Sequence, residues 1–356
     1  MTQGTAATWI APVDETDRGN LLGAAGLTAQ REARELTAIV EGAELAEAAL
    51  AAARESGLLI LPESSQVLDS AEQELELLRR ARNEGWRLLL LSLGADSSAQ
   101  SGELIECLLA RLAATPGPSG PRPVPPTALR HRVAVGSEEM FFRTGLMHVE
   151  CFEASLGKAG ASLADSTDLL DWGAGCGRMT VHLAAKAPGA RVTAADTDAE
   201  AIAWIAEHLG LHAAQALPLL PPTSFDSDSF DLAVGHSVFS HLDVEAQNRW
   251  LEELARVARP GAHVAVSFNG PVALRWHLEH PLVDVPASVE ADVANDGIGI
   301  WRGDGWEDEF YEGYHTTFHS HDYVREHWSR WFEVVAIDEA AALPTQDIAV
   351  LRRPAA

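Results

Sequence analysis

The C-terminal two thirds of the chain alternate between short apolar runs and longer stretches with helical spacing. An apolar run bounded by glycine or polar residues predicts a buried strand, whereas apolar residues three or four positions apart predict a helix packed on a sheet. Strands that alternate with helices indicate parallel βαβ units, and therefore an α/β fold with a doubly wound sheet. The predicted strands are Asp168–Trp172, Arg191–Ala195, Phe230–Gly235 and His263–Phe268, and the predicted helices are Phe141–Leu156, a segment ending near Lys186, Ala199–Leu209, Val244–Val257 and His321–Trp331. Two further predicted strands, Phe332–Ile337 and Gln346–Arg352, are joined by a tight connection and can pair antiparallel at one edge.

The first 114 residues carry a weaker version of this pattern. Apolar positions at helical spacing predict a helix over Thr28–Glu55. Short apolar runs predict strands at Leu58–Leu61 and Trp86–Leu93, on either side of a helix near Ser70–Glu84, and another helix covers Ile105–Leu112. These elements predict a small helical or α/β unit without a catalytic constellation. We expect it to serve in packing, as a lid, or in a homodimer formed through this unit.

A proline-rich segment separates the two patterns. Thr115–Thr127, TPGPSGPRPVPPT, contains six prolines and two glycines, which is typical of an extended linker. The sequence therefore predicts an accessory unit over residues 1–114, a linker over 115–127 and a second domain over 128–356. All fourteen histidines and eight of the ten tryptophans follow the linker, so the chemistry is expected in the second domain.

The first strand of the second domain runs into a glycine-rich turn, LLDWGAGCGRMT at residues 169–180. Ligands of open α/β sheets bind beyond the carboxyl ends of the strands, where glycine permits a positive φ and leaves room for a ligand. The nicotinamide fingerprint GxGxxG does not fit, because its third glycine would be Arg178 or Thr180. The spacing is GxGxG, formed by Gly173, Gly175 and Gly177.

This turn resembles the first motif of class I S-adenosylmethionine-dependent methyltransferases, and the resemblance continues in order from about residue 135 to 353. It includes RVTAADTD, which ends the second strand, PPTSFDSDSFDLAVGHSVFSHL at 221–242, ELARVARPGAHVAVS at 253–267, and YHTTFHSHDYV with QDIAVLRRP near the end. The resemblance implies a mostly parallel seven-stranded sheet with an antiparallel edge hairpin. It also implies an enzyme that uses S-adenosyl-L-methionine.

The same resemblance implies which residues bind the cofactor. The acid that closes the second strand, Asp196, would bind the ribose hydroxyls; its alternative role is a helix N-cap, for which Asp198 is better placed. Many relatives carry an acid after the third strand for the adenine amino group, where this chain offers Gln215. The full set is Asp171, Gly173, Ala174, Gly175, Gly177, Asp196, Thr197, Gln215 and His236. Trp172 either packs on the cofactor or ends the strand in the core.

A hydroxyl acceptor needs a base, and histidine is the usual one near neutral pH. The candidates at the carboxyl edge or in the later loops are His236, His241, His315 and His319, each of which is otherwise a structural residue. Residues 270–319 form a long insertion that we expect to be a substrate lid; its aromatic residues either stack on a substrate or pack on one another. His315, His319 and His321 are not expected to bind a metal, because the residues between His315 and His319 are poor helix formers.

The composition of the chain limits the classes of substrate and macromolecule that it is expected to bind. The net charge of −26 and the absence of a basic stripe argue against nucleic acid and against an anionic membrane surface, and small neutral or cationic substrates fit better. Apolar runs are too short to span a bilayer, and the N-terminus lacks the features of a secretory signal. Three widely separated cysteines favour a reducing cytoplasm, and arginine in place of lysine suggests a bacterial genome rich in GC. Cys176, inside the turn, is expected to be a small packing residue rather than a nucleophile.

The leading hypothesis is therefore methyl transfer to an O or N atom of a small molecule such as a natural product or a sugar. Two alternatives stay open at this point: a methyltransferase acting on a protein or peptide, and a scaffold that keeps the fold without turnover.

Overall fold

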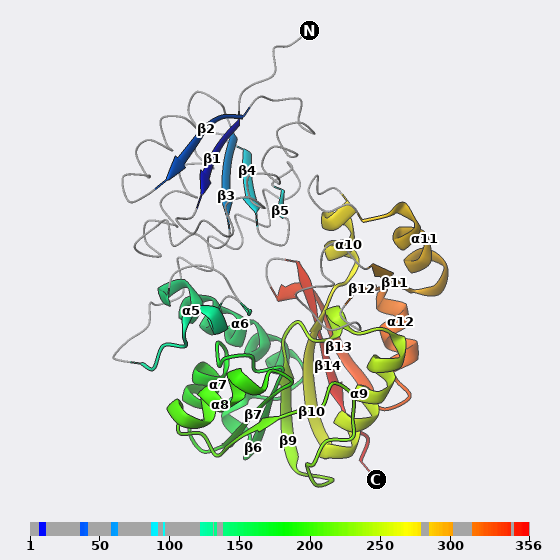
Figure 1. The fold of residues 1–356 in the computed structure, drawn as a ribbon. Coiled ribbons are helices and arrows are strands. Elements are labelled where there is room, and N and C mark those ends of the chain that lie inside the picture. Colours follow the sequence, from blue (N-terminus) through cyan, green and yellow to red (C-terminus); the bar gives the residue numbers. More distant parts are fainter. Residues whose placement is uncertain are drawn as a thin grey trace. The chain divides into compact units, whose positions relative to one another are not determined.

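The chain forms two compact units in a computed structural model (Figure 1). The described residues are 122–130, 132–133, 138–278, 285–301, 315–342 and 345–355, together with the backbone of five strands between residues 7 and 96. The first unit comprises Met1–Ser119, Ala134–Arg143 and His277–Asp284, and the second comprises Gly120–Val133, Thr144–Trp276 and Val285–Ala356. The predicted linker and domain boundaries stay predictions.

The first unit contains a five-stranded sheet of order β2-β1-β3-β4-β5. Its strands are β1 (Ala7–Ala11), β2 (Leu36–Glu41), β3 (Leu58–Pro62), β4 (Arg87–Leu91) and β5 (Ala95–Asp96), and only β5 runs antiparallel to its neighbour. The strands predicted near residues 58–61 and 86–93 are confirmed. The helix predicted over Thr28–Glu55 is wrong at β2, where pairing with β1 and the β-branched Ile39 and Val40 outweigh helical spacing. The helices predicted at Ser70–Glu84 and Ile105–Leu112 lie outside the described residues.

The second unit is built on a seven-stranded sheet of order β13-β14-β10-β9-β6-β7-β8. Its strands are β6 (Asp168–Trp172), β7 (Arg191–Asp196), β8 (Ala213–Ala216), β9 (Phe230–Gly235), β10 (Ala258–Phe268), β13 (Glu333–Ala342) and β14 (Gln346–Arg352). The five strands β6 to β10 are parallel to one another, and β14 runs antiparallel to both β10 and β13. The doubly wound, mostly parallel sheet and its antiparallel edge hairpin are confirmed.

Helices cover both faces of this sheet, because successive strand residues point to opposite sides. They are α6 (Glu138–Lys158), α7 (Thr180–Lys186), α8 (Ala199–His208), α9 (Val244–Val257) and α12 (His321–Trp328). The short helix α5 (Thr127–Arg130) precedes them in the chain, and short 3-10 turns lie at Leu163–Asp165 and Phe239–His241. Leu170 packs with residues of α9 and α12 on one face, and its neighbour Leu169 packs with residues of α6 and α7 on the other. The predicted helices of this unit are confirmed to within a few residues at each end.

The long insertion after β10 contains regular elements of its own. These are α10 (Pro271–Leu278), α11 (Ala287–Asp296), β11 (Ile298–Trp301) and β12 (Thr316–His319), and β11 pairs antiparallel with β12. Residues 279–284 and 302–314, which include several of the predicted lid aromatics, lie outside the described part. The segment between His315 and His319 is extended, as its poor helix formers indicate.

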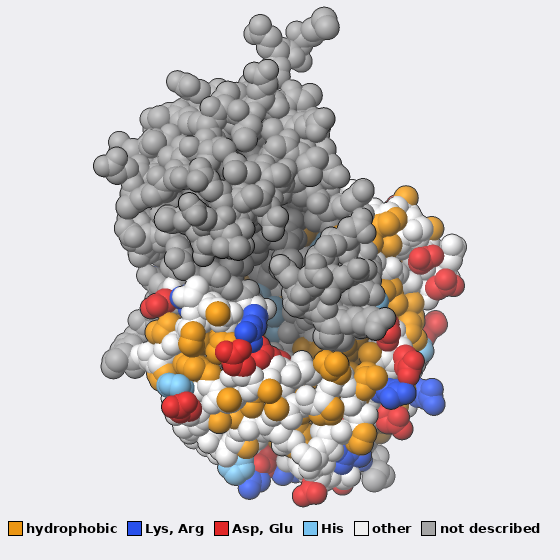
Figure 2. All heavy atoms as spheres, viewed as in Figure 1, with side chains coloured by type: hydrophobic (Ala, Val, Ile, Leu, Met, Phe, Trp, Pro, Cys, Tyr) orange, Lys and Arg blue, Asp and Glu red, His pale blue; other side chains and the backbone are white. Residues whose placement is uncertain are grey.

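Charged side chains of both signs are interspersed on the described surface of the face drawn in Figure 2. Among the helices in the described part of the chain, none combines the length and the apolar composition needed to cross a bilayer.

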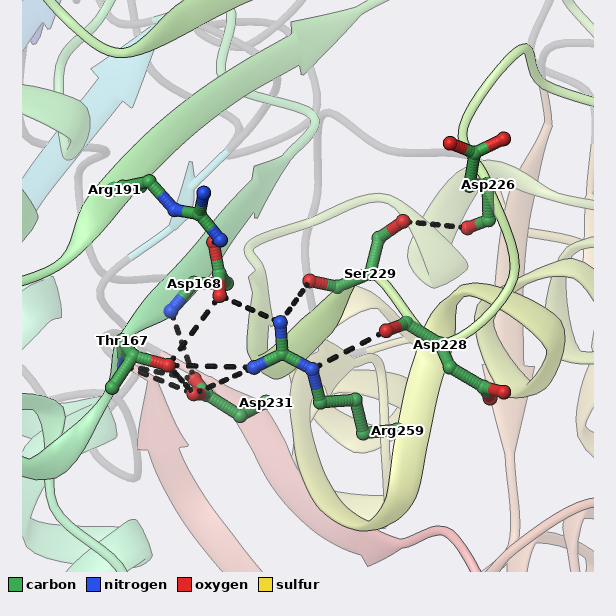
Figure 3. Close-up of polar contacts among 8 residues, drawn as sticks. All are labelled: Thr167, Asp168, Arg191, Asp226, Asp228, Ser229, Asp231 and Arg259. Carbon is green, nitrogen blue, oxygen red and sulfur yellow. Dashed lines mark hydrogen bonds and ion pairs between the residues drawn. The ribbon is translucent and has the colours of Figure 1, made fainter.

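Polar contacts tie the amino ends of the parallel strands together (Figure 3). The guanidinium of Arg259 donates to Asp168 at 2.6 Å and to Asp231 at 3.1 Å, and Arg191 reaches Asp168 at 2.5 Å. Asp231 also accepts from the backbone N–H of Thr167 at 3.0 Å. Burial by itself would raise the pKa of Asp168, but the two guanidinium groups outweigh it and lower that pKa. This cluster joins β6, β7, β9 and β10 at the edge opposite the glycine turn.

Candidate active site

The glycine turn follows β6 at the carboxyl edge of the sheet, and its backbone requires glycine. Gly173, Gly175 and Gly177 have φ values of +79°, +53° and +91°. The N–H groups of Gly173 and Ala174 donate to the carbonyl of Ala195 at 2.8 and 3.1 Å, which ties the turn to β7. A Cβ atom on Gly175 would lie 2.3 Å from Cγ1 of Val133.

Asp196 closes β7 beside this turn. Its carboxylate accepts from the N–H of Gly175 at 2.7 Å and from the N–H of Asp198 at 2.8 Å. Two carboxylate oxygens offer about four acceptor positions, so capacity for a pair of ribose hydroxyls is left after these two bonds. The N-cap of α8 is Asp198, which accepts from Glu200 and Ala201 at 3.1 Å. Burial raises the pKa of Asp196, partly offset by its backbone donors.

The other predicted cofactor residues surround this pair. Asp171 is only 2% exposed and accepts from the hydroxyl of Thr180 at 2.6 Å, and burial raises its pKa to about 7. Thr197 is exposed, and Gln215 lies on β8 opposite Ala195 and donates to Ser224. Trp172 is 3% exposed and packs against Phe239 and Trp250 in the core, so the structure favours its packing role.

Leu129 and Arg132, which lie just after the predicted linker, contact the glycine turn and the start of α8. Arg132 reaches Asp198 at 2.8 Å and Glu200 at 2.7 Å, at the start of α8. The thiol of Cys176 lies 3.5 Å from the carbonyl of Leu129. Burial raises the pKa of Cys176 to about 12, so the group stays a thiol and acts in packing.

His241 and His315, the two leading candidates for the base, lie together although 74 residues separate them. The N–H of His315 donates to the carbonyl of His241 at 3.2 Å, and Nδ1 of His241 lies 3.0 Å from the carbonyl of His315. A carbonyl can only accept, so Nδ1 of His241 carries the proton and Nε2 is the basic nitrogen of the neutral ring.

His236 follows β9 and lies in a different group. Its ring stacks at a tilt on His148 of α6 with 4.1 Å between centroids, and its Nδ1 lies 3.4 Å from the guanidinium of Arg178. Burial is the largest cause that lowers the pKa of both imidazoles well below the usual value. His236 and then Arg178 add to the effect on His148, and Arg178 and then His241 add to the effect on His236. Sequence reasoning missed Arg178 and His148. Arg178 could have been found, since it directly follows the last glycine of the turn.

The backbone that presents His236 is held in an unusual conformation. Ser237 has a φ of +58°, which is uncommon for a residue with a side chain and recurs at functional sites. Its N–H donates to the hydroxyl of Ser267 at 2.7 Å, and its own hydroxyl accepts from Gln346 at 2.9 Å. β10 and β14 therefore hold this turn from the neighbouring strands.

His319, the remaining candidate, is fully buried. Its Nε2 lies 3.1 Å from the amide oxygen of Gln247, and its ring packs edge-on against Phe268 and Trp328. Burial lowers its pKa to about 3. These contacts fit the structural alternative for His319. His321, the first residue of α12, pairs with buried Asp347 at 2.6 Å.

Residues 170–264 match the family model described as Methyltransferase domain. This range contains the glycine turn, Asp196 and the strand that carries His236. No curated protein sequence matches the chain.

Solved structures with a similar fold include several methyltransferases. An S-adenosylmethionine-dependent methyltransferase from Methanosarcina mazei is 21% identical, with a TM-score of 0.40 over 54% of this chain and 94% of its own. The 1,6-didemethyltoxoflavin-N1-methyltransferase of Burkholderia thailandensis, bound to 1,6-didemethyltoxoflavin and S-adenosylhomocysteine, is 17% identical, with a TM-score of 0.41 over 59% and 78%. An N-methyltransferase from Bradyrhizobium japonicum in complex with S-adenosyl-L-homocysteine is 15% identical, with a TM-score of 0.37 over 58% and 85%.

Residues 170–264 of the second unit therefore match a methyltransferase domain, and they lie in the mostly parallel seven-stranded sheet that the resemblance implies. This match supports a methyltransferase that uses S-adenosyl-L-methionine as its cofactor. The residues at the turn fit that molecule. The three glycines with positive φ have no side chains, so a ligand can approach the backbone of the turn closely. The carboxylate of Asp196 retains acceptor capacity for the two hydroxyls of a ribose.

Proposed function

We propose that this enzyme methylates an O or N atom of a small molecule, such as a natural product or a sugar, and that His241 is the general base. The observation that carries the proposal is the orientation of His241 by the carbonyl of His315 at the carboxyl edge of the sheet. The His241 side chain is only partly exposed, which suits an acceptor small enough to be enclosed.

Bound S-adenosyl-L-methionine supplies an activated methyl group on a sulfonium. The protein then has to place the acceptor in line with that methyl and remove the acceptor's proton, and positioning supplies a large part of the rate. With its proton held on Nδ1, His241 takes the acceptor's proton on Nε2. The resulting imidazolium keeps its hydrogen bond to His315.

The predicted cofactor-binding residues are part of the same proposal. Gly173, Ala174, Gly175 and Gly177 form the turn, and Asp171 stabilises it from the end of β6. Asp196 and Thr197 bind the ribose, and Gln215 binds near the adenine. The buried thiol of Cys176 and the wide separation of the three cysteines along the chain support a reducing cytoplasmic setting. We also keep the homodimer through the first unit as a prediction.

Two variants separate binding from chemistry. Asp196→Ala should weaken S-adenosylmethionine binding at least about tenfold in calorimetry, because two charge-assisted hydrogen bonds to the ribose are lost. His241→Gln should lower turnover by about 10²-fold or more and leave cofactor affinity within about twofold. The matched control is His208→Gln, since His208 is exposed on α8 and, within the described part of the chain, bonds to the carbonyl of Trp204 on its own helix.

The acceptor class is tested with labelled S-adenosylmethionine and an extract containing both metabolites and proteins. Label in the low-mass fraction supports the proposal. Label in polypeptides identifies a protein or peptide methyltransferase instead. Tight cofactor binding without any transfer identifies a scaffold, and unchanged turnover in His241→Gln removes the assigned base.

A further inference from the structure

One group of side chains at the carboxyl edge has nitrogen atoms without hydrogen-bond partners and a positive charge without an ion-pair partner among the described residues. It consists of Arg178, which follows the glycine turn, His236, which follows β9, and His148 on α6. Nδ1 of His148 and Nε2 of His236 are buried, and neither has a hydrogen-bond partner among the described residues. His148 is only 5% exposed, so water at the surface does not satisfy it.

The charge of this group is positive, and no fully ionised acid balances it within the part of the chain that the structure describes. Arginine stays protonated in proteins, and even with burial lowering its pKa to about 10, Arg178 is a cation at neutral pH. Among the described residues no acid forms an ion pair with it. Asp171 is the carboxyl group whose charge acts on Arg178, but it is held by Thr180 and its pKa of about 7 leaves it only partly ionised at neutral pH.

The two imidazoles do not add charge, since burial and Arg178 keep both neutral. A neutral imidazole can donate one hydrogen bond, and a guanidinium donates several in a planar fork that matches a carboxylate. One fixed cation with two adjacent unsatisfied imidazole nitrogens therefore forms a set of donors for a single anionic group. An unpaired buried cation is costly, and such an anion would offset that cost.

Resting on the proposed function, we infer that Arg178, His148 and His236 form a subsite for a carboxylate of the methyl acceptor. His236 and His241 lie on the same loop after β9, with Val238 between them packed at the glycine turn. A carboxylate bound at the first histidine would anchor an acceptor whose nucleophilic atom reaches the second. The acceptor is then a small acid, although the chain as a whole carries a charge of −26. Local charge, rather than net charge, selects the ligand at a buried site.

The cofactor itself carries a carboxylate, so the experiment must separate two sources of the same group. The probes are benzoate and its neutral isostere benzamide, each titrated into protein saturated with S-adenosylhomocysteine and into protein without it. We expect benzoate to bind the saturated wild type more tightly than benzamide does. We expect Arg178→Met to lose about tenfold or more in benzoate affinity and to keep S-adenosylhomocysteine affinity within about twofold.

Further variants keep the result interpretable. Arg178→Lys retains the positive charge but not the planar fork of donors, so its loss of benzoate affinity should be smaller than that of Arg178→Met. Arg178→Lys replaces Arg178→Met if the latter fails to fold. Arg249→Met is the matched control, because Arg249 is exposed and its ion pair among the described residues is with Glu245 one turn away. In NMR, benzoate should shift the ring signals of His148 and His236, which a merely structural role for these residues would not produce.

Two results overturn the inference. If Arg178→Met weakens S-adenosylhomocysteine at least about tenfold but leaves methylthioadenosine, which lacks the amino-acid part, unchanged, the carboxylate belongs to the cofactor. If benzoate binds no better than benzamide with or without cofactor, the group is not an anion subsite. Failure of the wild type to bind S-adenosylhomocysteine would instead count against the proposed function, and the cofactor-free titration would still decide the subsite.

Discussion

Backbone conformation decides which residues the cofactor turn accepts. Gly175 has a positive φ of +53°, and its missing side chain leaves room that Val133 occupies. Gly157, on α6, has open space around the position of a Cβ atom. The same chemical change at these two glycines should therefore have opposite consequences.

Gly175→Ala should lower both thermal stability and S-adenosylmethionine affinity, the latter at least about tenfold, whereas Gly157→Ala should leave affinity unchanged and raise stability by about 0.5–1 kcal/mol. The first substitution forces a methyl group within 2.3 Å of Val133 and places alanine in a left-handed conformation. Calorimetric titration and thermal melts measure both effects. Wild-type cofactor affinity in Gly175→Ala would contradict the assignment of this turn.

Asp171 should make stability depend on pH near neutrality. Burial raises its folded pKa to about 7, above the value of about 3.9 in an unfolded chain. Its contribution is therefore fully present below about pH 4 and is lost as the pH rises through about 7. Asp171→Asn cannot ionise, so its stability relative to wild type should increase between about pH 5 and pH 8 in denaturant titrations. A pH-independent difference would contradict this, and exposed Asp292→Asn on α11 is the control.

At the scale of elements, the two edges of the large sheet have different tasks. The amino edge carries paired charges that connect four strands. The carboxyl edge carries positive-φ residues, and imidazole nitrogens of His148 and His236 there have no hydrogen-bond partner among the residues that the structure describes. Satisfied polar networks rigidify a structure, and incompletely satisfied ones mark sites completed by a ligand. The amino edge therefore supports the site mechanically without touching it.

Arg259→Gln should lower thermal stability and make the protein more sensitive to acid, with little change in cofactor affinity. Asp168 has a lowered pKa, so its stabilising effect is present above about pH 4 and is lost as the pH falls through its folded pKa. Without Arg259 that pKa rises, and the acid-induced loss should begin at a higher pH. Circular-dichroism melts over the acidic range measure this, with Arg249→Gln as the exposed control. Identical acid profiles would show that Arg259 contributes nothing through Asp168.

At the scale of the whole molecule, net charge governs long-range association. The chain carries 52 acidic residues against 26 lysines and arginines. On the face drawn in Figure 2, the lysines and arginines are few and lie beside acidic side chains. Nucleic-acid affinity depends on neutralising phosphates and releasing counterions, which this balance disfavours.

We therefore expect no saturable binding of a fluorescent DNA duplex or of single-stranded RNA at physiological salt, measured by anisotropy. The prediction is independent of the local positive charge at Arg178, because one partly buried cation cannot follow a phosphate backbone. Saturable binding that weakens steeply with added salt would contradict it.

The strands and helices of the second unit follow from the sequence because their signals are local. The apolar run at Asp168–Trp172 and the N-cap at Asp198 each specify their element within a few residues. The helix predicted over Thr28–Glu55 failed for the opposite reason. Helical spacing and strand pairing compete there, and the parallel partner β1, some thirty residues away, decides in favour of β2.

The sequence alone indicated the class of cofactor through a family resemblance, because the GxGxG glycines and the acid after the next strand that carry this resemblance are visible in the sequence directly. It also determined the set of histidines from which a base could come. Only the tertiary structure decided how those histidines are grouped: His241 with the carbonyl of His315, His236 with His148 and Arg178, and His319 in the core. The spacing of the histidines along the chain does not reveal this grouping, because their burial and their hydrogen-bond partners come from elements far apart in sequence. Burial and hydrogen-bond partners decide which imidazole is neutral, oriented or inaccessible.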